Sequence, residues 1–395
     1  MNTAPQGDGA LRGGPAAATV SENPSIDRVT QAVDATDGRR RRSGAARTKA
    51  HRVLFVATLF QMPYRVMRCA RAAGAEKLYV LTNPGARGLA LSRHCARQFV
   101  SDSIIDGSRD ELLAREINRL VRDFDITMVM PGDAPATRSL IASRDLIDAP
   151  CFPLPGLDEF DLLNNKWAFT RLCRTLAIRC PTTRLFTDSA ALAQELASGH
   201  TDYPAVVKPV ELSGNEGVFR LDPDTIEAGL RKIDYRPVLL QDFIDGDDIG
   251  ASVYCRSGEI RAFVAHHLAD GVYSTFWDQR IFDDIRRILE PLKVDGVYNF
   301  DMRRTPHGEV YYLECNPRFF FKIDLSMLAG INFVGLGLAD HCSDGPAIIC
   351  PSGQLRSPRA LLSSPRNWTW RNAALALRVY SDPLPPLLER MGILG

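Results

Sequence analysis

The stretch from Val297 to Asn316, VYNFDMRRTPHGEVYYLECN, alternates twice between apolar and polar side chains. Alternation with a period of two is typical of β-strands, and Pro306-His307-Gly308-Glu309 between the two alternating segments is a turn signal. A hairpin with the two-residue turn His307-Gly308 is therefore predicted. The opposed pairs in this register are Asp301 with Glu314, Asn299 with Asn316, and Arg303 with Tyr312.

One face of this hairpin gathers side chains that carry oxygen atoms. Two carboxylates directly opposite each other destabilise a sheet, and a cation between them removes the repulsion. Carboxylate and amide oxygens are hard ligands that suit Mg²⁺ or Mn²⁺ rather than zinc. We therefore expect a metal site at Asp301, Glu314 and Asn316. The alternative is a solvated face with a raised carboxylate pKa.

The composition narrows the class of protein. A chain of 395 residues is long enough for two or three domains, and 48 Lys+Arg against 47 Asp+Glu exclude a wholesale polyanion binder. Nine cysteines occur singly, without zinc spacing, as in a reduced cytoplasmic protein. No apolar run reaches the roughly 18 residues of a membrane span. We expect a soluble, cytoplasmic protein.

Residues 1–50 differ from the rest of the chain. They are rich in Gly, Ala, Ser and Arg and have few large apolar side chains, so a disordered basic tail is expected. The run Arg39 to Arg42 is compatible with nucleic-acid or membrane-surface binding. Because the remaining chain is close to neutral, we expect neither partner and interpret the segment as solvated.

Strands and helices alternate over residues 51–158. Continuous apolar runs indicate strands buried on both faces at Val53–Ala57, Lys77–Leu81 and Ile126–Met130. Helical spacing links Val66, Cys69, Ala70 and Ala73, and also Leu112, Leu113, Ile117 and Leu120. This order predicts an α/β domain with a parallel sheet.

The pattern over residues 159–345 predicts an α+β arrangement of strands and short helices. A helix is expected over Leu162–Leu176, and strands over Tyr203–Pro209, Val238–Ile244, Ala251–Arg256 and Ile260–His267. Residues 346–395 form a C-terminal extension with one amphipathic helix around Trp370 to Tyr380. Lys208 emerges at a strand end, and the loop after it contains Gly214 and Gly217, whose backbone can approach an anion.

Taken in order, these features resemble the ATP-grasp superfamily. They are a strand-borne Lys-Pro, a loop of small residues, an apolar strand that ends QDFIDGDD, then Asn-x-Asp-x-Arg and Glu-x-Asn-Pro-Arg. The resemblance covers roughly residues 52–340 and is closest to the carbamoyl-phosphate-synthase-like, or carboligase-like, members. It implies a Rossmann-like pre-ATP-grasp domain (51–158), an ATP-grasp N-lobe (159–244) and an ATP-grasp C-lobe (245–345).

The resemblance also implies roles for single residues. ATP would be bound by Lys166, Lys208, the loop residues Ser213, Gly214 and Gly217, the hinge residues Gln241, Asp242, Phe243 and Ile244, and the ribose ligand Asp248. Two Mg²⁺ (or Mn²⁺) ions would be bound by Asp301, Glu314 and Asn316. Arg303 and Arg318 would stabilise the transferring phosphoryl group and an acyl-phosphate.

The implied activity is that of a carboxylate–amine ligase, in which ATP converts a carboxylate into an acyl-phosphate that an amine then attacks. Alternatives are an enzyme that forms carboxy- or carbamoyl-phosphate from bicarbonate, and a non-catalytic ATP-binding protein. The partners would be a small carboxylate and an amine, and a homodimer is compatible with the sequence. Phe319-Phe320-Phe321-Lys322 would narrow the acceptor site or join the core, and His266 or His267 would either contact substrate or be structural.

Overall fold

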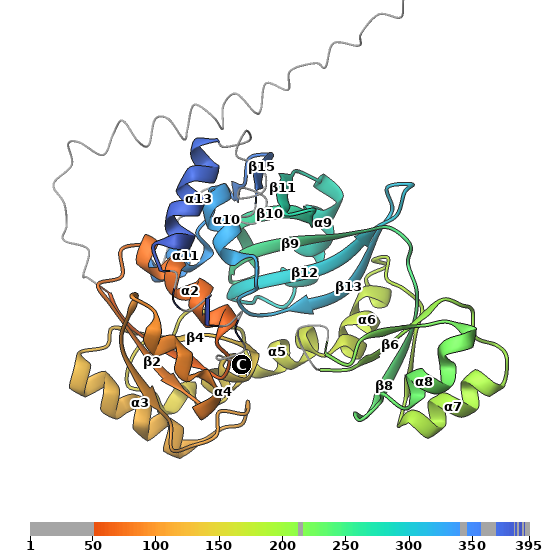
Figure 1. Ribbon diagram of the computed structural model, residues 1–395, viewed down its shortest axis with the longest axis horizontal. Coiled ribbons are helices and arrows are strands. Elements are labelled where there is room, and N and C mark those ends of the chain that lie inside the picture. Colours follow the sequence, from red (N-terminus) through yellow and green to blue (C-terminus); the bar gives the residue numbers. More distant parts are fainter. Residues whose placement is uncertain are drawn as a thin grey trace, which may run out of the picture. The chain divides into compact units, whose positions relative to one another are not determined.

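The computed structural model describes residues 51–211, 216–339, 346–356 and 369–382, with positions 384, 387, 388 and 391. The predicted tail over residues 1–50 lies outside the described residues, as do Ser213 and Gly214 of the predicted phosphate loop. Three β-sheets organise the described part of the chain (Figure 1). The predicted mixture of a parallel sheet and α+β parts is confirmed.

The first sheet is parallel and has the strand order β3-β2-β1-β4. Its strands are β1 (Arg52–Ala57), β2 (Lys77–Thr82), β3 (Cys95–Val100) and β4 (Met128–Pro131), and its helices are α2 (Gln61–Ala72), α3 (Glu111–Phe124) and α4 (Ala134–Ala142). Residues 53–57 are all buried, as their continuous apolar run predicts. Leu112 was wrongly expected on the buried stripe of α3. It is 60% exposed, because it is one residue, and thus about 100° around the helix, from the buried Leu113.

The second sheet is antiparallel, with the order β5-β8-β6-β7. It contains β5 (Thr183–Phe186), β6 (Ala205–Pro209), β7 (Phe219–Leu221) and β8 (Val238–Asp242). Helices α7 (Ser189–Ala197) and α8 (Ile226–Leu230) cover it, and its small core includes Leu192, Val207 and Leu240. Lys208 lies on its central strand β6.

The single helix expected over Leu162–Leu176 is in fact two helices. Helix α5 (Leu157–Asn164) and helix α6 (Lys166–Thr175) meet at Asn165, whose side chain accepts a hydrogen bond from the backbone N–H of Ala168. An asparagine with extended backbone and this bond is a helix N-cap, so the chain turns there. The break makes Lys166 the first residue of a helix instead of one in its interior.

The third sheet has the order β13-β12-β9-β10-β11-β15, with β14 paired to β10. Its strands are β9 (Asp247–Arg256), β10 (Glu259–Ala269), β11 (Val272–Phe276), β12 (Gly296–Arg304), β13 (Val310–Asn316), β14 (Ile348–Ile349) and β15 (Gly353–Arg356). Helix α9 (Gln279–Leu289) buries Ile281, Ile285 and Ile288 on one face. Helix α6 packs on the same face, where the Phe169 ring lies 6.1 Å from that of Phe300.

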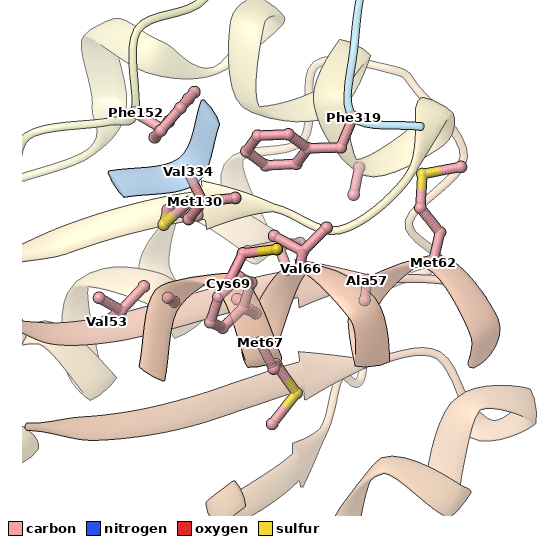
Figure 2. Packing of buried hydrophobic residues seen from close by; sticks show 14 of the residues in the cluster. Val53, Ala57, Met62, Val66, Met67, Cys69, Met130, Phe152, Phe319 and Val334 are labelled. Carbon is pink, nitrogen blue, oxygen red and sulfur yellow. The ribbon is translucent and has the colours of Figure 1, made fainter. Parts of the chain in front are cut away.

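The other face of this sheet joins the core of the first domain. Helices α10 (Ile323–Ala329) and α11 (Phe333–Leu338) contact α2, and the C-terminal helix α13 (Trp370–Tyr380) contacts β15. Phe319 and Phe320 are buried, and the Phe319 ring lies 5.0 Å from that of Phe152 (Figure 2). These two phenylalanines therefore belong to the core. Among the described residues, no helix is long and apolar enough to cross a membrane.

The β12–β13 hairpin confirms the register at the expected metal site and corrects it near the turn. Asp301 pairs with Glu314, and Asn299 pairs with Asn316. Arg303, however, pairs with Tyr311 and not with Tyr312. Thr305 and Glu309 are joined by a backbone hydrogen bond, so the turn has three residues, and a bulge beyond Met302 restores the expected pairing. The lobe boundary at residue 244 stays a prediction.

Candidate functional site

Two buried lysines from different elements approach strand β13. Lys166, at the start of α6, places its Nζ 3.3 Å from Oε2 of Glu314. Lys208, on β6, donates a hydrogen bond of 3.5 Å to the backbone oxygen of Leu313. Both lysines are about 5% exposed, and burial lowers the pKa of Lys208 to about 8, although Glu314 opposes this change. Buried ammonium groups are rare unless they are paired, so this pair of lysines points to an anionic ligand.

The predicted metal ligands converge on one point. The amide nitrogen of Asn316 lies 2.9 Å from Oδ2 of Asp301 and 3.4 Å from Oε1 of Glu314. Burial and the charge of Glu314 raise the pKa of Asp301 to about 6. Burial alone would also raise the pKa of Glu314, but Lys166 and Lys208 outweigh it and hold this pKa below its usual value.

This oxygen set fits a hard cation. Two carboxylates reach the amide nitrogen of Asn316, and its amide oxygen would face the same point only after a rotation that breaks its hydrogen bond with Arg318. No group of three or more His, Cys, Asp or Glu side chains suited to a metal occurs in the described part of the chain. The third donor of the candidate site is instead the amide of Asn316.

Arg318 lies next to these ligands and is almost completely buried. Its Nη2 donates to Oδ1 of Asn316 at 2.6 Å, and its Nη1 donates to the backbone oxygen of Phe319 at 3.2 Å. Its Nε has no partner among the described residues. Burial lowers the pKa of Arg318, while the charges of Glu314, Asp301 and Asp133 oppose this change. Asp133 follows β4, so Arg318 connects the metal ligands electrostatically to the end of the first sheet.

The predicted hinge residues form the end of β8 and the two residues after it, and Phe243 and Ile244 contact Arg303. The backbone N–H of Asp242 donates to Thr182, and the side chain of Gln241 donates to Thr183. Arg303 donates to Oδ1 of Asp248 and to the backbone oxygen of Ile244, both at 2.8 Å. The guanidinium carbon of Arg303 also lies 5.1 Å from the centre of the Phe243 ring. Arg303 thus contacts the hinge and the expected ribose ligand, whereas Arg318 contacts a predicted metal ligand.

Gly217 is the last of the loop residues that were predicted to bind phosphate. Its φ of +68° is a conformation that favours glycine, and a Cβ atom there would lie 2.6 Å from Cε1 of Tyr235. The Tyr235 hydroxyl donates to the backbone oxygen of Gly217 at 2.6 Å. Tyr235 fixes this end of the loop and was not found in the sequence, because it lies outside the loop motif.

Solved structures share this architecture. The L-amino acid ligase from Bacillus licheniformis superposes with a TM-score of 0.55 at 18% identity, covering 74% of each chain. The ADP complex of N5-carboxyaminoimidazole ribonucleotide synthetase gives 0.59 at 14% identity, over 78% of this chain and 81% of that chain. The biotin carboxylase domain of Hydrogenobacter thermophilus 2-oxoglutarate carboxylase, solved with MgADP and bicarbonate, gives 0.57 at 14% identity, over 76% and 72%.

A family model described as ATP-grasp in the biosynthetic pathway with Ter operon matches residues 234–350. The chain has the ATP-grasp fold. D-aspartate ligase from Enterococcus faecium is 25% identical over 248 residues, which are 53% of this chain and 58% of that ligase. The chain therefore spans little more than half the length of that relative.

A chain of buried polar side chains extends from the predicted metal ligands into the third sheet. Asn299 donates to Asp301 at 3.1 Å and accepts from the Ser252 hydroxyl at 2.9 Å. That hydroxyl lies 3.5 Å from Nε2 of His266, which fills the space left by Gly250. Burial lowers the pKa of His266 to about 3, so the ring is neutral. This geometry favours the structural interpretation of His266.

Sequence reasoning missed two cations near the site. The charge of Lys322 opposes the rise in the pKa of Asp301 and adds to the lowering of the pKa of His266, so its ammonium lies close enough to influence a predicted metal ligand. Arg220 on β7 places its guanidinium carbon 4.9 Å from the centre of the Phe243 ring, which is also contacted by Arg303. Neither residue is part of a recognisable motif. Their positions follow from how the strands pack.

Proposed function

We propose that this protein is an ATP-dependent, ADP-forming ligase that joins a carboxylate to an amine. The observation that carries the proposal is the approach of Lys166 and Lys208 to β13, where Glu314 and Asp301 lie side by side. A buried set of two cations and two carboxylates is costly unless a highly charged ligand uses it. A nucleoside triphosphate with a divalent cation provides charges of both signs.

Each residue has a distinct task in this proposal. Lys166 and Lys208 neutralise the phosphates, and the backbone of residues 241–244 reads the adenine edge. Arg303 holds the hinge by its bonds to Ile244 and Asp248. Asp301, Glu314 and Asn316 would hold Mg²⁺ or Mn²⁺, for which we propose two ions, and the metal would supply positive charge that stabilises the transferring phosphoryl group.

The reaction is proposed to have two steps. A carboxylate oxygen attacks the γ-phosphorus of ATP, the bond to the bridging oxygen of ADP breaks, and an acyl-phosphate forms. An amine then attacks the acyl carbon, phosphate leaves, and the nitrogen loses a proton to give an amide. Arg318 is the guanidinium placed to stabilise the anionic groups, and exclusion of water between the lobes would prevent hydrolysis of the acyl-phosphate.

The relatives support one substrate class. Two of them are named D-aspartate ligase and L-amino acid ligase. We propose that at least one of the two substrates is an amino acid. An enzyme that activates bicarbonate instead would release ADP with bicarbonate as the only acceptor, which the assay below distinguishes.

The test is a screen of amino acids, other carboxylates and bicarbonate, each added alone, for ADP release with ATP and Mg²⁺, with hydroxylamine present to trap the acyl-phosphate as a hydroxamate. Glu314→Gln should abolish ADP release, since it removes a charge that pairs with Lys166. Glu309→Gln is the matched control, because Glu309 lies at the turn of the same hairpin and pairs with Arg179. Formation of AMP, or near-normal turnover by Glu314→Gln, would refute the proposed mechanism.

A further inference from the structure

A second charged site lies away from the proposed nucleotide site. A cavity of about 320 Å³ is bordered by the second half of α2, the loop before β3, helix α10 and the end of α13. Its ionisable lining residues are Arg68, Arg71, Arg93, His94, Asp324 and Arg378. The volume is at the lower end of the range of small-molecule sites, which suits a compact metabolite.

The positive charge of this cavity is only partly compensated. Asp324, the one carboxylate among its described lining residues, lies 3.2 Å from Arg68 and is shared with Arg65. Arg71 binds the backbone oxygens of Ala75 and Glu76, which are uncharged acceptors. Asp382, just outside the lining, accepts hydrogen bonds from the Ser92 hydroxyl and the backbone of Arg93. The cavity therefore has an excess of positive charge.

The contacts of individual arginines around the cavity support the binding of an anionic ligand. The side chain of Arg68 is only 10% exposed, and it donates to Asp324 and to the Tyr64 hydroxyl, with its guanidinium carbon 4.1 Å from the centre of the Tyr64 ring. Its Nε has no partner in the described part of the chain. Arg93 and Arg378 are exposed at the cavity, and among the described residues the guanidinium of Arg378 donates one hydrogen bond, to the sulfur of Met327 at 3.6 Å. A sulfur atom is a weak acceptor, so within the described part of the chain this guanidinium retains most of its donor capacity.

The cavity is separate from the proposed catalytic site. The first turn of α2 lies at the ends of β1 and β4, where Pro63 packs against Gly132. Arg68 and Arg71 lie five and eight residues further along the helix, which corresponds to about 8 and 12 Å at 1.5 Å per residue. None of the predicted ATP or metal ligands lines the cavity.

We propose that this cavity binds a small organic anion with at least two negative charges, carried by phosphate or carboxylate groups. Guanidinium groups bind both kinds of oxyanion through two parallel hydrogen bonds, and several of them around one cavity select for multiple charge. The ligand would contact the first domain through α2 and the C-terminal extension through α13. The inference does not depend on the ligase activity.

Isothermal titration calorimetry of the full chain with pyrophosphate and with citrate tests the proposal, with saturating ADP present to occupy the nucleotide site and with Mg²⁺ omitted, since both probes chelate it. The double variant R93Q/R378Q removes two exposed charges from the cavity. Arg115→Gln is the matched control, since Arg115 is 72% exposed on α3 and far from the cavity in sequence. Thermal melts establish that each variant is folded, and the single variants R93Q and R378Q replace the double variant if it is not.

One or both probes should bind the wild type and R115Q, and R93Q/R378Q should lose about tenfold or more in affinity, as expected for the loss of charge-assisted hydrogen bonds. Binding of pyrophosphate alone assigns phosphate groups to the ligand, and binding of citrate alone assigns carboxylates. The proposal is overturned if neither probe binds the wild type, or if R93Q/R378Q binds as tightly as R115Q.

Discussion

We expect Lys208 to lower the free energy of unfolding of the nucleotide-free protein at neutral pH. Burial lowers its pKa from the ordinary value of 10.5 to about 8, and Glu314 compensates only in part. At about 1.4 kcal/mol for each pH unit, this difference corresponds to about 3 kcal/mol. Because only 5% of this residue is exposed, screening by solvent does not reduce the effect much.

The direction of the pKa change determines whether Lys208 stabilises or destabilises the folded protein. The folded protein binds the Lys208 proton less tightly than the unfolded chain does, so the charged form opposes folding. The cost is fully present below pH 8, decreases between pH 8 and pH 10.5, and disappears above that range. Lys208→Met keeps the length of the side chain and removes the charge, so it should raise the free energy of unfolding at pH 7 by up to about 3 kcal/mol.

Urea unfolding without nucleotide, followed by circular dichroism at pH 7 and pH 10, measures this effect. Lys208→Met should be more stable than the wild type at pH 7 and much closer to it at pH 10. It should also fail to bind ATP in calorimetry, since the phosphates lose a cation. Lys77→Met is the control, because Lys77 is exposed at the start of β2 and should change little at either pH. A variant less stable than the wild type at pH 7, or a gain that is equal at both pH values, would refute the argument from burial.

Two further predictions concern the metal ligands and the phosphate loop. The pKa of Asp301 is raised to about 6, so the folded protein favours the neutral carboxyl group. The stability that this neutral form contributes is present below the usual pKa of aspartate and is lost as the pH rises through 6. Asp301→Asn should therefore raise the melting temperature at pH 7.5 while it abolishes Mg²⁺-dependent ADP release, and an unchanged or lower melting temperature would contradict this. Gly217→Ala should destabilise the protein by about 1–2 kcal/mol from its positive φ, with an added cost from the close contact with Tyr235. Gly199→Ala is the control, because Gly199 also has a positive φ, of +74°, but a Cβ atom there would meet no atom within 4 Å. If both variants lose the same free energy of unfolding in urea, the contact with Tyr235 is unimportant.

The sequence by itself determined the strands and the pairing at the centre of the site. Alternation over Val297 to Asn316 is a local pattern, and it placed Asp301 opposite Glu314 as the structure has them. The pattern could not reveal that the turn has three residues and that a bulge compensates for it. Both arrangements bring the same residues together at the metal ligands, and they differ only near Arg303. The pairing of Asp301 with Glu314 was therefore predicted correctly from a turn that was wrong.

Two features escaped the sequence analysis because the pattern of apolar residues does not mark them. Strand β3, CARQFV, lies at the edge of its sheet with no fully buried residue, so it has no apolar run to mark it. The end of α5 at Asn165 was hidden because apolar residues continue with helical spacing on both sides of the cap. In both cases hydrogen bonds to the backbone, and not burial of apolar surface, define the element.

Only the tertiary structure decided which distant residues meet. The fold brings Lys166 to within 3.3 Å of Glu314, places Arg303 at the hinge, and gathers arginines from α2, the loop before β3 and α13 around one cavity. None of these approaches follows from periodicity, because periodicity reports which face of an element is buried and not which element covers it. That choice depends on how the hydrophobic cores pack, and it gathers lysines and arginines that are ordinary in the sequence into the two clusters that we propose bind anions.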